Sequence, residues 1–256
     1  MPQLSAITKQ SHADKSWTRF SSYSFATKSS IASLVGAEIA KAVTGGLPLA
    51  FVKEQDRFFL AAVLSLTPGT NLFVARNGKW LGEYIPSVFR SYPFMLGKAE
   101  GNDNPILCVD EDSGLVKDDK SAEPFFDDQG ELSKSIQDIL NFLSQIEKNK
   151  RQTVRAVSAL AETGVITEWL LKIKQGDQEK PVTGLYRIDE AKLNFLEDEK
   201  LLKIRKAGAL PIAYAQILSM GNIQNFAQLA KAHEQLKKPG PGIQPILGDD
   251  DMISFQ

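Results

Sequence analysis

One long amphipathic segment, residues 133–163, constrains the fold more than any other part of this sequence. Apolar side chains recur there every three or four residues, and the pattern resumes after a polar stretch at residues 147–153. Ser133 is a typical N-cap residue, and Gly164 is typical of the position just after a helix. The apolar stripe consists of Ile136, Ile139, Leu140, Leu143, Ile146, Val154, Val157, Leu160 and Ala161. The pattern predicts one helix that spans the middle of the molecule.

The regions on either side of this helix differ in kind. Before it, residues 57–66 are apolar on both alternating faces and residues 106–109 are apolar throughout, which indicates two buried strands. After it, residues 166–174 and 182–188 predict a hairpin whose turn spans residues 176–181. Four helices then follow, at residues 189–195, 197–206, 212–220 and 223–236. Strands first and helices later, with hairpins in place of βαβ units, predict an α+β fold with an antiparallel or mixed sheet.

Three further local predictions concern the first hundred residues. Helical spacing of apolar residues over 31–43, stopped by two glycines, predicts a helix. Residues 71–75 form a short apolar run and predict a strand. The pair Asn77-Gly78 predicts a type I′ turn, because both central residues of that turn need positive φ. Pro86 opens a short helix that ends before Pro93.

The sequence predicts one domain over residues 1–238. An extended arm of about the first 30 residues, rich in Ser, Thr and Lys, wraps over the core. Residues 239–256, which begin Pro-Gly-Pro-Gly, are expected to be a flexible tail. Two domains are the alternative.

Composition excludes several kinds of chemistry. The chain has 256 residues but one cysteine and two histidines, too few for a disulfide framework or an ordinary zinc site. Its net charge of -1 gives no general attraction to nucleic acid, so no nucleic-acid partner is predicted. The near-neutral total is a cancellation, since residues 100–131 hold eleven acids and two bases. No cofactor is predicted, with a divalent cation as the alternative.

No apolar run approaches the roughly 20 residues that a membrane helix needs, so no integral membrane span is predicted. The first residues lack the apolar core of a secretory signal peptide. We therefore expect a cytoplasmic protein by default, with signal-independent export to the cell surface as the alternative.

The densest group of aromatic side chains lies in residues 80–94. It combines four rings with one cation, a pairing that can bind a sugar, a planar ring or a carboxylate. The candidate ligand- or partner-binding residues are Trp80, Tyr84, Arg90, Tyr92 and Phe94. The alternative is that the rings close the core and that Arg90 pairs with a nearby acid.

Carboxylates follow the buried strand at residues 106–109. Asp110 and Asp112, with Asp127 and Asp128, are candidates for a hard cation that prefers oxygen ligands. Asp110 and Glu111, with Arg90 and Tyr92, are the catalytic candidates if the protein is an enzyme. The alternative for the acids is a solvated loop.

The remaining reactive side chains receive structural interpretations. Cys108 lies in an apolar run and is expected to act as a small buried hydrophobe. His12 and His233 are expected at the surface. The Gly-rich phosphate loop, the nucleophile elbow and the two-His helix motif of zinc proteases are absent from the sequence. The adjacent rings Phe125 and Phe126 indicate that the acidic loop is pinned to the body.

Several segments together resemble a known family. They include Asn71-Leu72-Phe73-Val74, Gly78-Lys79-Trp80, Tyr84-Ile85-Pro86, Arg90-Ser91-Tyr92-Pro93-Phe94, Leu107-Cys108-Val109-Asp110-Glu111-Asp112-Ser113, Phe126-Asp127-Asp128-Gln129-Gly130, Gly184-Leu185-Tyr186-Arg187-Ile188-Asp189-Glu190 and Tyr214-Ala215-Gln216-Ile217-Leu218-Ser219. In order, and with the opening His12 to Trp17, they resemble the SapC family of bacterial proteins over residues 12–229. That resemblance implies an association with bacterial surface layers and no catalytic motif.

Two functional hypotheses follow. The first is a non-enzymatic accessory or interaction protein with a protein or surface-component partner, linked by resemblance to surface-layer or envelope biology. The second is an enzyme of unrecognised type that uses carboxylates, Arg and Tyr, with or without a divalent cation.

Overall fold

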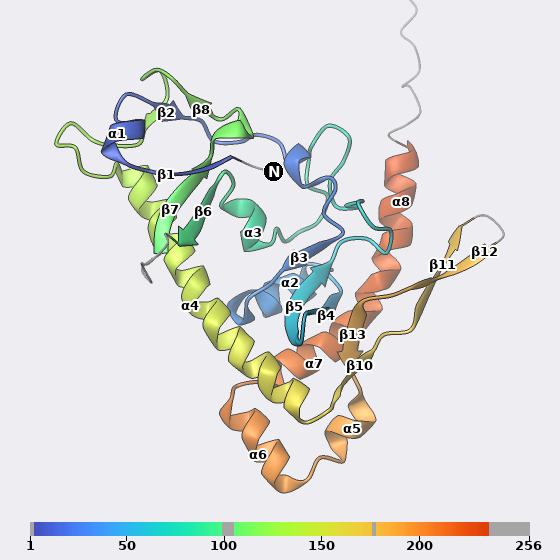
Figure 1. The fold of residues 1–256 in the computed structure, drawn as a ribbon. Coiled ribbons are helices and arrows are strands. Elements are labelled where there is room, and N and C mark those ends of the chain that lie inside the picture. The colour runs from blue at the N-terminus through green and yellow to red at the C-terminus, as the bar shows by residue number, and fades with distance from the viewer. Residues whose placement is uncertain (1–2, 99–104, 176–177, 236–256) are drawn as a thin grey trace, which may run out of the picture.

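The computed structural model describes residues 3–98, 105–175 and 178–235. The chain has an α+β fold, as predicted: its strand ladders are antiparallel, and most of its helical residues follow residue 133. Figure 1 shows two groups of strands, one near the N-terminus and one lower in the view, with a long helix running beside both.

The larger sheet has five strands in the order β10-β13-β4-β5-β3. Its centre is the tight pair β4 (Leu49–Glu54) and β5 (Arg57–Val63), in register from Leu49 opposite Ala62 to Glu54 opposite Arg57. The predicted central strand over residues 57–66 is confirmed for most of its length. The outer strands are β3 (Ile31–Ser33), β13 (Leu185–Ile188) and β10 (Ile166–Glu168).

The N-terminal strands build a second, smaller layer. β1 (Leu4–Ala6), β7 (Pro105–Asp110) and β6 (Phe94–Lys98) form one sheet, and β2 (Ser16–Trp17) lies between β8 (Val116–Lys117) and β9 (Glu123–Pro124) in another. Their apolar side chains surround Phe125, which has no exposed surface. The prediction that the acidic loop is pinned by this phenylalanine pair is therefore confirmed for Phe125.

Helix α4 (Lys134–Glu162) connects the two apolar cores. Ser133 Oγ accepts from the Ile136 amide, so Ser133 is the N-cap, as predicted. Near its start, Ile136 and Leu143 pack in the smaller core with Trp17 and Phe94. Near its end, Val157 and Leu160 pack in the larger core beneath the five-stranded sheet. One helix thus supplies apolar side chains to both layers.

Short helices follow the last strand of the larger sheet. They are α5 (Glu190–Asn194), α6 (Asp198–Lys206), α7 (Leu210–Ser219) and α8 (Asn225–Gln235). Helix α7 is joined to the sheet by the fully buried Gln216. Its Oε1 accepts from the Ile188 amide at 2.8 Å, and its Nε2 donates to the Leu49 carbonyl at 3.2 Å. These bonds satisfy backbone groups of two strands at once.

A hairpin projects from the lower sheet. β11 (Leu171–Gln175) and β12 (Gln178–Val182) pair with each other from Leu171 opposite Val182 to Gln175 opposite Gln178. Figure 1 shows this ribbon extending away from β10 and β13. The predicted hairpin exists, but it is divided between this ribbon and the β10–β13 pair. The predicted turn is too long, because β12 begins at Gln178; residues 176–177 lie outside the described residues.

The helix predicted over residues 31–43 is wrong in its first part. Residues 31–33 form β3, which pairs with Val63, Ala62 and Ala61 of β5. The chain then makes a short 3-10 turn, Gly36–Glu38, and only Ile39–Thr44 is α-helix (α2). Pairing with a central strand outweighs local helical periodicity here.

The strand predicted at residues 71–75 is also wrong, since only an isolated bridge joins Val74 to Trp80. The turn between them has positive φ at Gly78 alone, so it is not the type I′ turn expected. The short helix after Pro86 is α3 (Ser87–Arg90).

The one-domain boundary stays a prediction, and its tail, residues 239–256, lies outside the described residues. In the part of the chain described, no helix is both long and apolar enough to cross a membrane.

Candidate functional site

The aromatic segment at residues 80–94 is organised around a buried carboxylate that the sequence did not single out. Glu38 is 5 % exposed and ends the 3-10 turn before α2. Its Oε1 accepts from the Tyr84 hydroxyl at 2.6 Å and from the Ser87 amide at 2.7 Å. Its Oε2 accepts from the Ser87 hydroxyl at 2.8 Å and from the Val35 amide at 3.2 Å. Four donors therefore compensate the burial of one charge.

Trp80 and Tyr84 belong to this cluster. The Trp80 indole donates to the Tyr84 carbonyl at 3.0 Å, and its ring packs in the larger core. Burial raises the pKa of Tyr84, and the hydrogen bond to Glu38 raises it further. The phenol therefore stays protonated and serves as a donor.

Arg90 covers the cluster from outside. Its guanidinium lies 3.8 Å from Glu38 Oε1 and 3.3 Å from the Tyr84 hydroxyl. It also lies over the Phe142 ring, 5.0 Å from the ring centre. The side chain is 41 % exposed, so one of its faces remains open to solvent. The sequence analysis left open that Arg90 pairs with a nearby acid, and Glu38 is such an acid.

The other two aromatic candidates lie elsewhere. Tyr92 stacks on Phe25 with ring centres 3.9 Å apart. Burial raises the pKa of Tyr92, and the charge of Asp110 raises it further. Phe94 packs edge-on against Trp17 in the smaller core. The five predicted binding residues thus divide into the Glu38 cluster and two separate contacts.

The N-terminal layer contains a second polar cluster, and here the sequence prediction for His12 was wrong. His12 has no exposed surface, because the N-terminal arm places it beneath the acidic loop, against the Phe125 ring. Its Nδ1 lies 2.7 Å from Ser11 Oγ, and its Nε2 lies 3.0 Å from Glu111 Oε1. The second contact is electrostatic, since Nε2 forms no hydrogen bond of acceptable geometry to the described residues.

Glu111 is held in place from several sides. The Ser5 hydroxyl donates to its Oε1 at 2.8 Å, and Lys15 Nζ approaches within 3.3 Å. Burial alone would raise the pKa of Glu111, but the bonds from Ser5 and Lys15 outweigh it and the pKa is lowered. Burial lowers the pKa of His12, although Glu111 opposes the effect. Near neutral pH the pair is a carboxylate beside a neutral imidazole.

The cluster has the order hydroxyl, imidazole, carboxylate that activates a nucleophile in acyl transfer. A neutral His12 can accept the Ser11 proton at Nδ1 while Glu111 faces the opposite nitrogen. Local sequence gave no signal for this pairing, because Glu111 reaches His12 only when β1 pairs with β7. Glu111 was named as a catalytic candidate, but with different partners.

Two of the four carboxylates considered for a cation have local structural roles. Asp110 accepts from the Asp112 amide and caps the 3-10 turn at Glu111–Ser113. Asp127 accepts from the amides of Gln129 and Glu131. Among the residues described, no three His, Cys, Asp or Glu side chains converge as a metal site would require. Asp110, Asp112, Asp127 and Asp128 are therefore not brought together.

The remaining histidine and the cysteine have simple environments. His233 is half-buried, and its Nε2 lies 2.9 Å from the Leu72 carbonyl. Cys108 is a free, partly buried thiol beside Gly97. Neither lies in the His12 cluster.

An apolar hollow of about 320 Å³ lies at the base of the β11–β12 hairpin. Trp169, Leu171 and Val182 line it, and Leu170 at its edge is 87 % exposed. Leu170 belongs to the lining of the hollow, and apolar side chains gathered at one place mark interaction sites more often than single exposed ones do. Among the residues described, six of the ten exposed large hydrophobic side chains lie between residues 170 and 218.

These features define an α+β protein with two apolar cores, each bordered by a buried polar cluster. In a comparison with known protein families, residues 7–226 match the family described as SapC. The chain belongs to the SapC family. No curated protein and no solved structure matches it.

Proposed function

We propose that this SapC family protein is a non-enzymatic accessory or interaction protein that binds an extended segment of a partner protein at the β11–β12 hairpin. The observation that carries the proposal is a projecting two-stranded ribbon beside an apolar hollow. Much of the chemistry predicted for residues 80–94 is used internally, because Glu38, Tyr84 and Ser87 satisfy one another.

The ribbon offers backbone groups as well as apolar surface. Each of its strands pairs only with the other among the strands described, so each has an open edge. An open edge can accept an additional strand through main-chain hydrogen bonds, while a pocket beside it selects side chains. An isolated two-stranded ribbon is marginally stable in water, so a third strand would also stabilise it.

The experiment is site-specific photo-crosslinking of the full chain in the cells that produce it. A photoreactive residue in place of Leu170 should capture one discrete partner, and Leu170→Asp should weaken its co-purification about tenfold or more. Leu218→Asp is the matched control, because Leu218 is 75 % exposed on helix α7 and does not line the hollow. Equal loss with both variants, or no capture at Leu170, would count against the hairpin as the binding element.

The family resemblance supports a further part of the proposal, that the partner belongs to the bacterial surface layer or envelope. Cell fractionation tests it: the protein should co-fractionate with envelope components in amounts that fall with Leu170→Asp. Recovery only as a free monomer would contradict this part.

A second candidate function is an acyl-transfer enzyme, favoured by the order Ser11, His12, Glu111. Ser11 is exposed, whereas the imidazole and carboxylate behind it are shielded. The other residues first considered for catalysis, Asp110, Arg90 and Tyr92, make their contacts elsewhere. A fluorophosphonate probe should label the chain at Ser11, and Ser11→Ala should abolish labelling. Labelling that persists in Ser11→Ala, or none at all, would exclude this candidate.

A further inference from the structure

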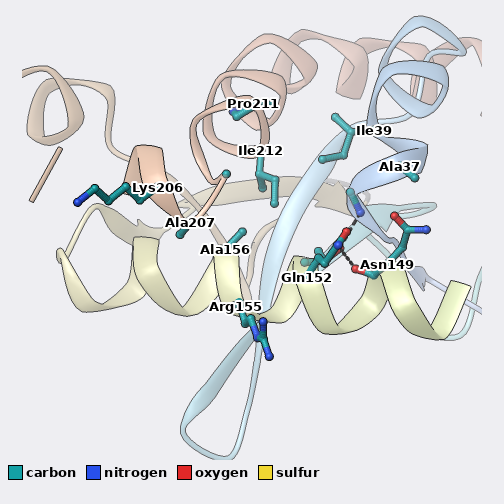
Figure 2. A pocket seen from close by; sticks show the side chains of 13 residues that line it. Ala37, Ile39, Asn149, Gln152, Arg155, Ala156, Lys206, Ala207, Pro211 and Ile212 are labelled. Carbon is teal, nitrogen blue, oxygen red and sulfur yellow. Dashed lines mark hydrogen bonds between the residues drawn. The ribbon is translucent and has the colours of Figure 1, made fainter. Parts of the chain in front are cut away.

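A groove of about 550 Å³ lies where three parts of the chain meet. Its floor is helix α4, one wall is the turn that leads into α2, and the other wall is the corner between α6 and α7. Figure 2 shows α4 below and the start of α7 above, with Asn149 and Gln152 reaching toward the turn at Ala37. Cavities of this size hold small-molecule ligands in other proteins.

Small side chains keep the groove open. Gly36, Ala37, Ala156, Ala207 and Gly208 all line it. At Gly208 the chain has a φ of +69°, a conformation that L side chains rarely adopt. This glycine ends α6 and lets the chain turn directly into α7. The groove therefore forms because small residues pack at the corner between α6 and α7.

The charges around the groove are one-sided. Arg155 and Lys206 line it, and no carboxylate does. Within the described chain neither cation forms an ion pair, whereas neighbouring cations do: Arg151 pairs with Glu147, and Lys203 pairs with Glu162. Unpaired cations around a groove without acids attract anions.

The polar side chains on the groove floor differ in whether they are bonded: among the described residues, Asn149 Nδ2 donates to the Gln145 carbonyl at 2.8 Å. The side-chain amide of Gln152 forms no hydrogen bond to the described residues. Thr153 Oγ1, by contrast, is occupied, because it accepts from the Gly36 amide at 2.7 Å and donates to the Asn149 carbonyl at 2.8 Å. Pro211 and Ile212 in the first turn of α7 add apolar surface to the lining, and Pro211 has no backbone N–H to donate.

The two cations lie at the rim. In Figure 2 the head groups of Arg155 and Lys206 extend away from the centre of the groove. Both side chains are exposed and unpaired, so rotation about their side-chain torsions is unhindered by an ion partner. For both to contact one anion, the guanidinium and the ammonium must turn inward from the positions seen in Figure 2.

We propose that this groove binds a small molecule that carries a phosphate group. Arg155 and Lys206 neutralise the phosphate, and Gln152 donates to it. The site is separate from the hairpin, so this proposal does not depend on the proposed partner-binding function.

The test is calorimetric titration of the full chain with inorganic phosphate and with glycerol 3-phosphate, at constant ionic strength and with glycerol as the neutral match. Saturable binding of glycerol 3-phosphate but not of glycerol is expected. Arg155→Gln and Lys206→Gln should each weaken it about tenfold. Arg151→Gln is the matched control on the same helix, because Arg151 pairs with Glu147 and does not line the groove. The affinity of the Arg151→Gln variant for glycerol 3-phosphate should equal that of the wild type.

A further variant tests the groove without removing a cation. Gln152→Glu places a carboxylate on the floor at an exposed helical position, so it should fold normally and abolish binding. Vesicles that contain phosphatidylglycerol distinguish a lipid headgroup from a free metabolite as the source of the phosphate. No saturable binding of either phosphate probe, or binding that all three variants leave unchanged, would overturn the proposal.

Discussion

Replacing Glu38 by Gln tests whether the buried carboxylate holds the turn before α2 and the aromatic segment together. In the wild type two donors point at each oxygen, and each oxygen receives one backbone amide and one hydroxyl. Glutamine replaces one oxygen with an NH₂ group. The hydroxyl on that side can rotate and accept, but the backbone N–H of Ser87 or of Val35 is left without an acceptor.

The size of the effect follows from those contacts. An unsatisfied buried donor costs about 1–3 kcal/mol, and each of the remaining bonds loses about 1 kcal/mol when its acceptor is no longer charged. Relief from burying the charge offsets part of this loss. We therefore expect Glu38→Gln to lower the free energy of unfolding by about 2–4 kcal/mol.

Urea denaturation followed by circular dichroism and by tryptophan fluorescence measures this change. The dependence of the free energy on urea should stay constant while the midpoint falls. Ser87→Ala is the control, since it removes one hydroxyl and keeps both backbone amides; it should cost about 1–2 kcal/mol. If Glu38→Gln lowers the free energy of unfolding by less than about 1 kcal/mol, the four donors do not depend on a carboxylate acceptor and the reasoning is refuted.

Three further predictions concern other parts of the fold. Burial lowers the pKa of His12, so the unfolded chain binds a proton more readily and stability should fall as pH drops below about 6.5. His12→Asn should flatten this dependence in denaturation measured from pH 7 to 5, and an unchanged slope would contradict the assignment. Gly78→Ala should destabilise by about 2 kcal/mol or more in thermal unfolding, because φ is +77° and the new Cβ would lie 1.8 Å from Ser22 Oγ. Gly164→Ala, with φ of +74° and no atom within 4 Å, should cost only about 1 kcal/mol; equal costs would show that the clash is relieved. Gln216→Leu should lower the unfolding free energy by about 2–4 kcal/mol, because the Ile188 amide loses its acceptor. Leu218→Ala on the exposed face of the same helix should change it by less than about 0.5 kcal/mol, and similar effects of the two would contradict the bridging role of Gln216.

Features that depend on local spacing were predictable. The long helix α4 was confirmed because its apolar stripe, its Ser133 cap and the glycine after it all lie within one segment. The same holds for Asp189, whose side chain caps α5. Strand β5 was recognisable because a strand that is covered on both faces is apolar on both, and the second half of β5 is buried throughout.

Features that depend on pairing between distant segments were not predictable. Residues 31–33 have helical spacing but form a strand, because β5 offers an open edge to them. The turn at Gly78 closes against Ser22 and Ser24 of the arm, which no local pattern indicates. The candidate sites follow the same division: Trp80, Tyr84 and Arg90 were named, but the carboxylate at their centre was not.

The sequence by itself determined the α+β class, the long helix, the scarcity of Cys and His and the membership of the SapC family, since each depends on composition or on order along the chain. Only the tertiary structure decided that Glu38 would be buried beneath Tyr84 and Arg90, and that His12 would face Glu111. It also decided that α4 and α7 would leave a groove lined by cations but no acids. The physical reason is that a charge or an imidazole can be buried only where donors from other segments meet it, and those segments come together only on folding.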